Sequence, residues 1–302
     1  CPSGDFARDP SCWNVADFRR RIWGLGVRRD TESGEVRLYY AVWGSQGFGN
    51  PEHAGAGDDA RNSVWSIALA GDGDFDTATV RREFILPDFF RSPEAIARAG
   101  VSHPVADIAF ADYADQTVML LAERGGLRNR GLDAENSFAF PHEARVLRYE
   151  IGEDGSWQPQ GRYDVAYGDR QGDGPPYLRA NSAGGVAFGM NHDENGALRD
   201  SHPDAFVWMS GDSLCTPASP CPGGDEDVHG LQGNAADAFA EIEPEAAFQP
   251  YPAPGPATAP DGPDTAYMID ADLGAGDGND ATRIGDIAIR QSVPMLSQAP
   301  AE

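Results

Sequence analysis

Two aspartates in equivalent positions of a repeated pattern are the strongest candidates for chemistry. Asp107 lies within VADIAF (105–110) and Asp286 within IGDIAI (284–289). Carboxylates that converge from repeated strands can hold a divalent cation, and a cation with open coordination positions activates water for attack on an ester or lactone. A cation-dependent hydrolase of this kind would use Asp107, Glu123 and Asp286 as its catalytic residues.

A structural role is the alternative for these two aspartates, and it is the one we favour. In this interpretation each Asp is buried and accepts backbone N–H bonds from the neighbouring repeat. The other two repeats carry Gly24 and Gly185 at the aligned position. A complete ring of carboxylates is therefore absent, and no catalytic residue is assigned by a motif.

A second group of carboxylates lies in an Asp/Gly-rich run. Oxygen ligands at alternate positions suit Ca²⁺, but this run lacks the glutamate that ends an EF-hand loop. Asp-Gly steps are also the ordinary residues of hairpin turns, which is the interpretation we favour over a structural calcium site. Calcium is the one cofactor that the sequence suggests, and its candidate ligands are Asp270, Asp272, Asp277 and Asp280.

The four cysteines form two local pairs, Cys1 with Cys12 and Cys215 with Cys221. Their spacings do not match the paired hooks of a zinc site. Two disulfides are the favoured interpretation, which places the chain in an oxidising compartment. The alternative is that Cys1 is the acylated residue of a bacterial lipoprotein, which would leave Cys12 unpaired.

Composition excludes several functions. All 23 basic residues are arginine, which removes Schiff-base lysine chemistry and a Walker-A phosphate site. The G-x-S-x-G elbow and the H-E-x-x-H zinc motif are absent as well. A net charge of −25 disfavours nucleic acid and anionic lipid as partners. No apolar run approaches the roughly 18 residues of a transmembrane helix.

A fourfold repeat predicts the architecture. Each copy begins with a strand of small, alternating residues, at 22–27, 105–110, 183–188 and 284–289. Second strands are predicted at 37–43, 117–123 and 205–210, third strands at 63–69, 144–151 and 265–270, and fourth strands at 80–86 and 160–165. Four short antiparallel strands per copy predict an all-β fold, a β-propeller-like array of four-stranded blades. A β-sandwich with similar hairpins is the alternative.

The predicted organisation is one large domain that follows a short N-terminal segment. Residues 1–17 form a disulfide-stapled N-terminal segment, and residues 18–302 form the β-propeller-like domain, with a Pro-rich insertion at 243–264 in the third blade. Three visible blades do not close a ring. Closure would need blades hidden in the insertions, another chain or further sequence.

Long loops are expected on one face of this array. The loops that join second to third strands, and each blade to the next, emerge together, and here they are 44–62, 87–104, 125–143, 166–182 and 211–264. Polar loops on a rigid scaffold commonly carry binding residues, although long loops also collect polar residues without a function. The predicted binding-face residues are His53, Arg61, His103, Arg128, Arg130, His142, Arg179 and His229.

The blade pattern, clearest in VADIAFADYADQTVMLLAERG (105–125), resembles bacterial extracytoplasmic β-propeller proteins of uncharacterised type. This resemblance spans roughly residues 18–290 and implies a ring-like binding scaffold. It carries over no functional residue by motif. The aspartate pair is similar to the axial carboxylates of calcium-dependent lactonase and esterase propellers.

We therefore expect a bacterial extracytoplasmic protein, secreted, periplasmic or attached to the cell surface. It would present its loops to a protein or glycan partner within a larger assembly. The alternative function is a calcium-dependent lactonase or esterase. Membrane attachment is expected only if Cys1 is lipidated.

Overall fold

The structure is a computed structural model. It describes residues 21–44, 56–87, 104–111, 116–124, 144–163, 165, 167–168, 177–178, 181–190, 203–214, 228–239, 267–270 and 286–289. The predicted segment 1–17 and the predicted disulfide cysteines Cys1, Cys12, Cys215 and Cys221 lie outside the described residues.

Three four-stranded antiparallel sheets make up most of the described chain, and each follows sequence order. The first sheet contains β1 (Ile22–Arg29), β2 (Val36–Val42), β3 (Ser63–Leu69) and β4 (Phe75–Ile85). The second contains β5 (Val105–Phe110), β6 (Val118–Glu123), β7 (Val146–Ile151) and β8 (Trp157–Tyr163). The third contains β11 (Ser182–Gly189), β12 (Phe206–Leu214), β13 (Val228–Ala235) and β14 (Tyr267–Asp270).

The remaining described elements are small. A two-stranded ribbon pairs β9 (Tyr167–Gly168) with β10 (Tyr177–Leu178), and η4 (Gly57–Ala60) is a single 3₁₀ turn. No α-helix occurs among the described residues, so the predicted all-β class is confirmed. None of the helical structure in that part of the chain is long and apolar enough to cross a membrane.

Two short hairpin turns illustrate how the local sequence forms these sheets. Between β1 and β2, the Asp30 carboxylate accepts hydrogen bonds from the Ser33 backbone N–H and from its hydroxyl, both at 2.7 Å. Gly34 then adopts a positive φ of 74°, which glycine tolerates without a steric penalty. Between β7 and β8, Asp154 accepts from Ser156 in the same way and Gly155 has φ 76°.

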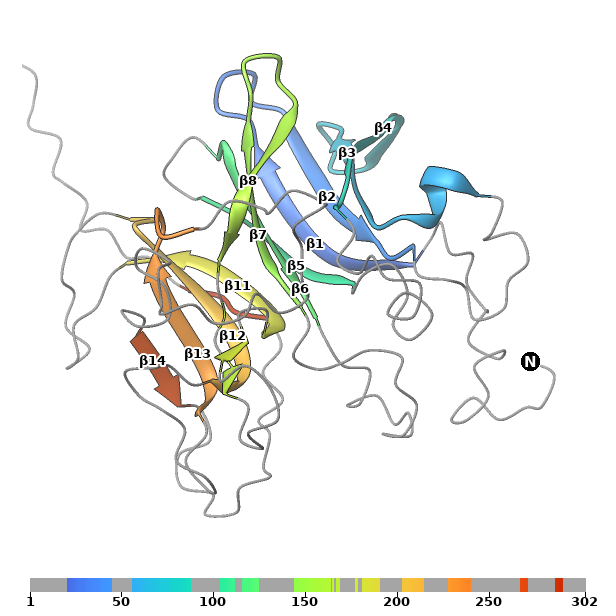
Figure 1. Cartoon of the computed structure of the whole chain (residues 1–302). Coiled ribbons are helices and arrows are strands. Elements are labelled where there is room, and N and C mark those ends of the chain that lie inside the picture. Colours follow the sequence, from blue (N-terminus) through green and yellow to red (C-terminus); the bar gives the residue numbers. More distant parts are fainter. Residues whose placement is uncertain are drawn as a thin grey trace, which may run out of the picture.

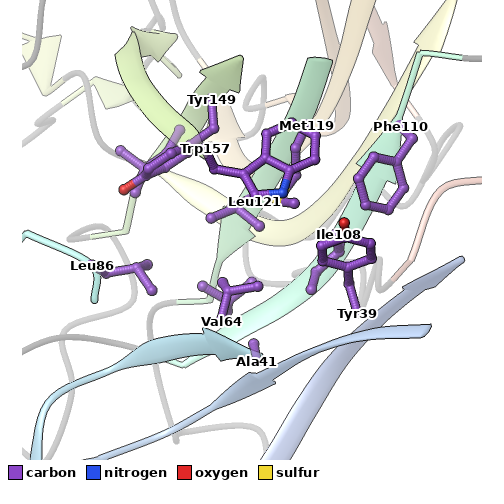
Figure 2. Close-up of a cluster of buried hydrophobic side chains, with 12 residues drawn as sticks. Tyr39, Ala41, Val64, Leu86, Ile108, Phe110, Met119, Leu121, Tyr149 and Trp157 are labelled. Carbon is purple, nitrogen blue, oxygen red and sulfur yellow. The ribbon is translucent and has the colours of Figure 1, made fainter. Parts of the chain in front are cut away.

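The second sheet lies between the first and the third (Figure 1). Its two faces are both apolar, because each packs on a different neighbour. One core joins the first and second sheets and includes Tyr39, Ala41, Val64, Leu86, Ile108, Phe110, Met119, Leu121, Leu147, Tyr149 and Trp157 (Figure 2). The other joins the second and third sheets and includes Val118, Leu120, Ala122, Val146, Tyr163, Val186, Phe188, Val207 and Met209.

The first strands of successive sheets are in contact, β1 with β5 and β5 with β11. Small residues in β1 permit this approach. A Cβ added at Gly26 would lie 2.6 Å from the carbonyl oxygen of Ile108, and one at Gly24 would lie 3.0 Å from the Asp107 nitrogen. Close approach of neighbouring backbones is therefore the reason for glycine at both positions.

Gly26→Ala is expected to destabilise the protein by about 1–3 kcal/mol, since the new methyl group would force two backbones apart. Urea unfolding followed by tryptophan fluorescence measures the change. Gly71→Ala is the matched control, because a Cβ there meets nothing within 4 Å. Equal stability of the two variants would contradict the close contact of β1 with β5.

The third sheet corrects one prediction. Its third strand is β13, and β14, which contains most of the predicted third strand 265–270, is the fourth. The sequence of β13, VHGLQGNA, has two glycines and few β-branched residues, so propensity does not reveal it. The Pro-rich stretch 243–264 consequently connects the third and fourth strands, and 211–264 is not a single loop between the second and third.

The fourth copy of the repeat is described only at residues 286–289, which form no strand. This short segment nevertheless lies against the third sheet, since a Cβ on Gly189 would be 3.2 Å from the Ile289 Cδ1 atom. The described part of the fourth copy is thus placed beside the third sheet, the position that the repeat order predicts for it.

Candidate functional site

The connections at the two ends of the first and second sheets differ in length. At one end, short turns join the strands, at 30–35, 70–74, 111–117 and 152–156. At the other end are the long connections 43–62, 86–104, 124–145 and 164–181. Strand order alone places these long connections at one end of each sheet, as the sequence predicts. What the structure adds is the set of contacts at their bases.

A buried ion pair lies where the connection between β6 and β7 starts and ends. Glu123 is the last residue of β6, and its side chain is fully buried beside that of Arg145. The two carboxylate oxygens accept from Arg145 Nη2 at 2.6 Å and from Nε at 2.8 Å, a two-pronged contact. The Arg145 backbone N–H also donates to Glu123 Oε2 at 3.0 Å. Charge-assisted bonds of this geometry are strong when water is excluded.

The same arginine holds the preceding connection. Arg145 Nη2 donates to the carbonyl oxygen of Pro87 at 2.8 Å, and the Arg124 N–H donates to that of Pro104 at 2.9 Å. Pro87 and Pro104 therefore both lie beside the Glu123–Arg145 pair. Ser182 N–H donates to the carbonyl oxygen of Ala144 at 3.1 Å, which brings the end of the next connection to the same place.

The connection between β2 and β3 ends close by. The Asn62 side-chain oxygen accepts from Gly44 N–H at 2.9 Å, and its carbonyl oxygen accepts from Leu86 N–H at 2.8 Å. We call this cluster the loop base, defined by Gly44, Asn62, Leu86, Pro87, Pro104, Glu123, Arg124, Ala144, Arg145, Asn181 and Ser182. Four long connections from three sheets are joined there by hydrogen bonds.

Asp107 connects the second and third sheets. Its side chain is 7% exposed, and Oδ2 accepts the backbone N–H of Val186 in β11 at 2.8 Å. The predicted structural role, a buried Asp that accepts a backbone N–H from the neighbouring sheet, is confirmed for this residue. The Val186 N–H can bond to Asp107 because β11 bulges between Ser182 and Val186, and the bulge interrupts the pairing of β11 with β12.

The two aspartates of the repeat meet. Burial raises the pKa of Asp107 to about 7; the hydrogen bond from Val186 N–H opposes this rise, and a hydrogen bond to Asp286 together with its negative charge adds to it. Asp286 itself is exposed. Burial and a neighbouring carboxylate therefore both favour the neutral form of Asp107.

The two aspartates do not form a metal site by themselves. Within the described residues, no group of three or more histidine, cysteine, aspartate or glutamate side chains is arranged to hold a metal ion. Glu123, the third carboxylate predicted for a hydrolase, has both oxygens bonded to Arg145. Asp107 and Asp286 offer two carboxyl groups, and any cation held there would need further ligands from elsewhere.

Few of the predicted binding-face and metal residues are described. Arg61 lies at the loop base, where Nη2 approaches the Leu86 carbonyl oxygen at 3.5 Å, and His229 is the second residue of β13. Asp270 ends β14. The other predicted residues, His53, His103, Arg128, Arg130, His142, Arg179, Asp272, Asp277 and Asp280, lie outside the described residues.

A polar cavity at the opposite, short-turn end was not predicted. It has a volume of about 550 Å³ and is lined by residues of both signs, including Arg28, Asp30, Glu35, Arg37 and Arg81. Arg37 donates to Ser66 Oγ at 2.9 Å and to the Thr79 carbonyl oxygen at 2.8 Å. In the sequence, the feature that could have indicated this cavity is the placement of Arg28 and Arg37 on the two strands that flank the first hairpin turn.

No protein-family model matches this chain, and no curated protein matches it either. The resemblance to bacterial extracytoplasmic β-propellers therefore stays a prediction.

Proposed function

We propose that this chain is a binding scaffold. Its sheets would be blades of a β-propeller-like array, and its long loops would contact a protein or glycan partner as part of a larger assembly. The proposed location is extracytoplasmic on the strength of the two cysteine pairs, and the proposed bacterial origin rests on the resemblance to bacterial β-propeller proteins. The aspartate pair would be a structural link between repeats.

The loop base is the observation that carries this proposal. A binding surface made of loops needs fixed ends, because each residue that is ordered on binding costs about 1–2 kcal/mol of backbone entropy. The Glu123–Arg145 pair and the hydrogen bonds to Pro87 and Pro104 supply such fixed ends. Buried charges are costly to desolvate, so an ion pair at this position supports a positioning role.

Native mass spectrometry of the protein purified from its own source tests the proposal. We expect a metal-free chain within a larger complex. Replacing residues 126–142 by a short Gly-Ser linker should release the chain from that complex while the circular dichroism of the sheets is kept. Replacing 243–264, which joins β13 to β14 at the opposite end of the third sheet, should leave the complex intact.

The alternative function is a cation-dependent lactonase or esterase, and the Asp107–Asp286 contact favours it. The same experiment separates the two functions when it is repeated with a chelator. A stoichiometric metal that is lost together with hydrolysis of p-nitrophenyl acetate would support the enzyme. A chain of unchanged mass without esterase activity would contradict it.

A further inference from the structure

The polar cavity at the short-turn end lies between the first and second sheets. Its lining comes mainly from the turn between β1 and β2 and from the turn between β7 and β8, which Figure 1 shows next to each other. Its volume of about 550 Å³ falls within the range of small-molecule sites, roughly 300–1,000 Å³. The long connections leave from the other end of these sheets, so this cavity is separate from the proposed loop surface.

Arg28 is a buried arginine of the lining that keeps unbonded donors. Its side chain is 9% exposed. Nε donates to the Gln116 carbonyl oxygen at 2.7 Å, and Nη2 donates to Asp30 Oδ2 at 3.1 Å. A guanidinium group carries N–H donors on three nitrogens. Among the described residues, nothing accepts a hydrogen bond from Nη1. Because Arg28 lines the cavity, the Nη1 donors are available to a molecule bound there.

The surroundings of Arg28 hold its guanidinium group in one orientation. The group lies 5.8 Å from the centre of the Trp157 ring, a favourable contact between a cation and an aromatic face. Gln116 has a φ of 50°, which is unfavourable for a residue with a side chain. Two bonds from β1 hold Gln116 there, one from Arg28 Nε to its carbonyl oxygen and one from the Arg29 N–H to its side-chain oxygen at 2.6 Å. A donor that is already oriented loses little entropy when it binds a ligand.

The other two arginines of the lining differ in their bonding. Arg37 is buried, and each of its three side-chain nitrogens already donates to a neighbouring group, so it belongs to the wall. Arg81 is 56% exposed, and its Nε donates to Glu83 Oε1 at 2.9 Å. Its two terminal nitrogens bond to none of the described residues. Arg81 is therefore a second source of unbonded positive charge.

Glu32 supplies the opposite charge. The lining contains three carboxylates, and the other two are each bonded to an arginine. Glu32 is exposed and has no hydrogen bond or ion pair with any described residue. The cavity thus presents unbonded groups of both signs, a guanidinium nitrogen of Arg28 on one side and the Glu32 carboxylate on the other. Such groups form strong hydrogen bonds with ligand groups of opposite charge.

The charges of the molecule indicate which ligand fits. A net charge of −25 repels an anion, and the three arginines of the lining repel a cation. A small zwitterion, which carries one carboxylate and one ammonium group, avoids both kinds of repulsion because its net charge is zero. It also gives each unbonded group of the cavity a partner of opposite charge.

We propose that this cavity binds a small zwitterion, such as a short peptide with both termini free. The ligand carboxylate accepts from Arg28 Nη1, and the ligand ammonium group donates to the Glu32 carboxylate. This inference goes beyond the proposed function, because the cavity lies at the end of the sheets opposite to the long loops. The assignment rests on the two unbonded side-chain groups and on the fixed orientation of Arg28.

Isothermal titration calorimetry of the full chain with triglycine tests the proposal. We expect triglycine to bind with a dissociation constant below about 1 mM. N-acetyl-triglycine lacks the ammonium group, and triglycine amide lacks the carboxylate. Each of these two analogues should bind more weakly than triglycine, the amide by at least about tenfold, because it gives up the bond to a buried guanidinium group.

Substitutions locate the ligand in the cavity. Glu32→Gln should weaken triglycine binding about two- to fivefold, as expected for an exposed ion pair, and leave N-acetyl-triglycine unaffected. Glu153→Gln is the matched control, since Glu153 is exposed in the turn between β7 and β8 and does not line the cavity. Arg28→Gln should weaken triglycine binding at least about tenfold. Circular dichroism checks that each variant keeps its sheets, and Glu32→Gln with the two analogues decides the matter if Arg28→Gln does not fold.

Several results would overturn the proposal. Triglycine that does not bind at about 10 mM would show that the cavity takes no zwitterion. N-acetyl-triglycine that binds as tightly as triglycine would indicate an anion site, and triglycine amide that does so would indicate a cation site. Equal effects of Glu32→Gln and Glu153→Gln would place the ligand elsewhere. None of these measurements involves the long loops, so this proposal and the proposed function fail or hold separately.

Discussion

Glu123→Gln is expected to lower the free energy of unfolding by about 3–5 kcal/mol, because it leaves the Arg145 guanidinium buried without its counter-charge. Both side chains are at most 2% exposed, so water does not replace the lost partner. The loss should be visible in urea denaturation. Hydrogen exchange should also become faster at the N–H groups of Arg124 and Ser182, which belong to the loop base.

Two further variants make this result specific. Asp59→Asn removes an exposed partner of Arg82 and should change stability by less than about 1 kcal/mol. The double variant Glu123→Leu with Arg145→Leu removes both charges, and it should recover part of the stability. Faster exchange in this double variant despite regained stability would show that the ion pair positions the loops. A Glu123→Gln protein as stable as the original would contradict a role of the pair in anchoring them.

Asp107→Asn is expected to stabilise the protein above neutral pH. The pKa of Asp107 is raised to about 7 in the folded protein from an ordinary value of 3.8. The folded state therefore holds a proton that the unfolded state releases. Its stabilising contribution is complete below pH 4 and is lost as the pH rises through about 7. Between pH 5.5 and 8.5, this loss amounts to about 2 kcal/mol.

Asparagine keeps an oxygen that can accept the Val186 N–H but never ionises, so the variant should lack this part of the pH dependence. Urea unfolding at pH 5.5, 7 and 8.5 measures the free energy of unfolding of both proteins. Taking the difference between the two proteins at each pH cancels the effect of the other carboxylates. Asp286→Asn should give an intermediate profile, because the burial of Asp107 remains when the neighbouring charge is removed. Parallel profiles for Asp107→Asn and the original protein would show that Asp107 is ionised throughout.

Much of the fold could be predicted from local pattern. The strands 63–69 and 105–110 have the predicted limits because alternating apolar residues and flanking turn residues determine them together. The strand β13 was not predicted, because its two glycines interrupt the alternation of apolar residues on which such a prediction depends. The arrangement of the sheets as propeller blades stays a proposal, because strand patterns do not report how sheets pack.

The candidate site was predictable in part. The repeat indicated that Asp107 and Asp286 occupy equivalent positions, and they prove to be neighbours. Glu123 was predicted as a cation ligand, yet its charge is bonded to Arg145, which is 22 residues away in the sequence. A pair across a long connection has no fixed spacing, so no motif could reveal it.

By itself, the sequence determined the all-β class, the hairpins and the side of each strand that is apolar, because these depend on residues two to six positions apart. Only the tertiary structure decided which apolar faces are covered. Leu25 and Ile108 are equivalent in the repeat and similar in chemistry, but one is 53% exposed and the other 4%. Burial depends on what lies on the other side of a sheet, and that neighbour is specified by contacts between distant parts of the chain.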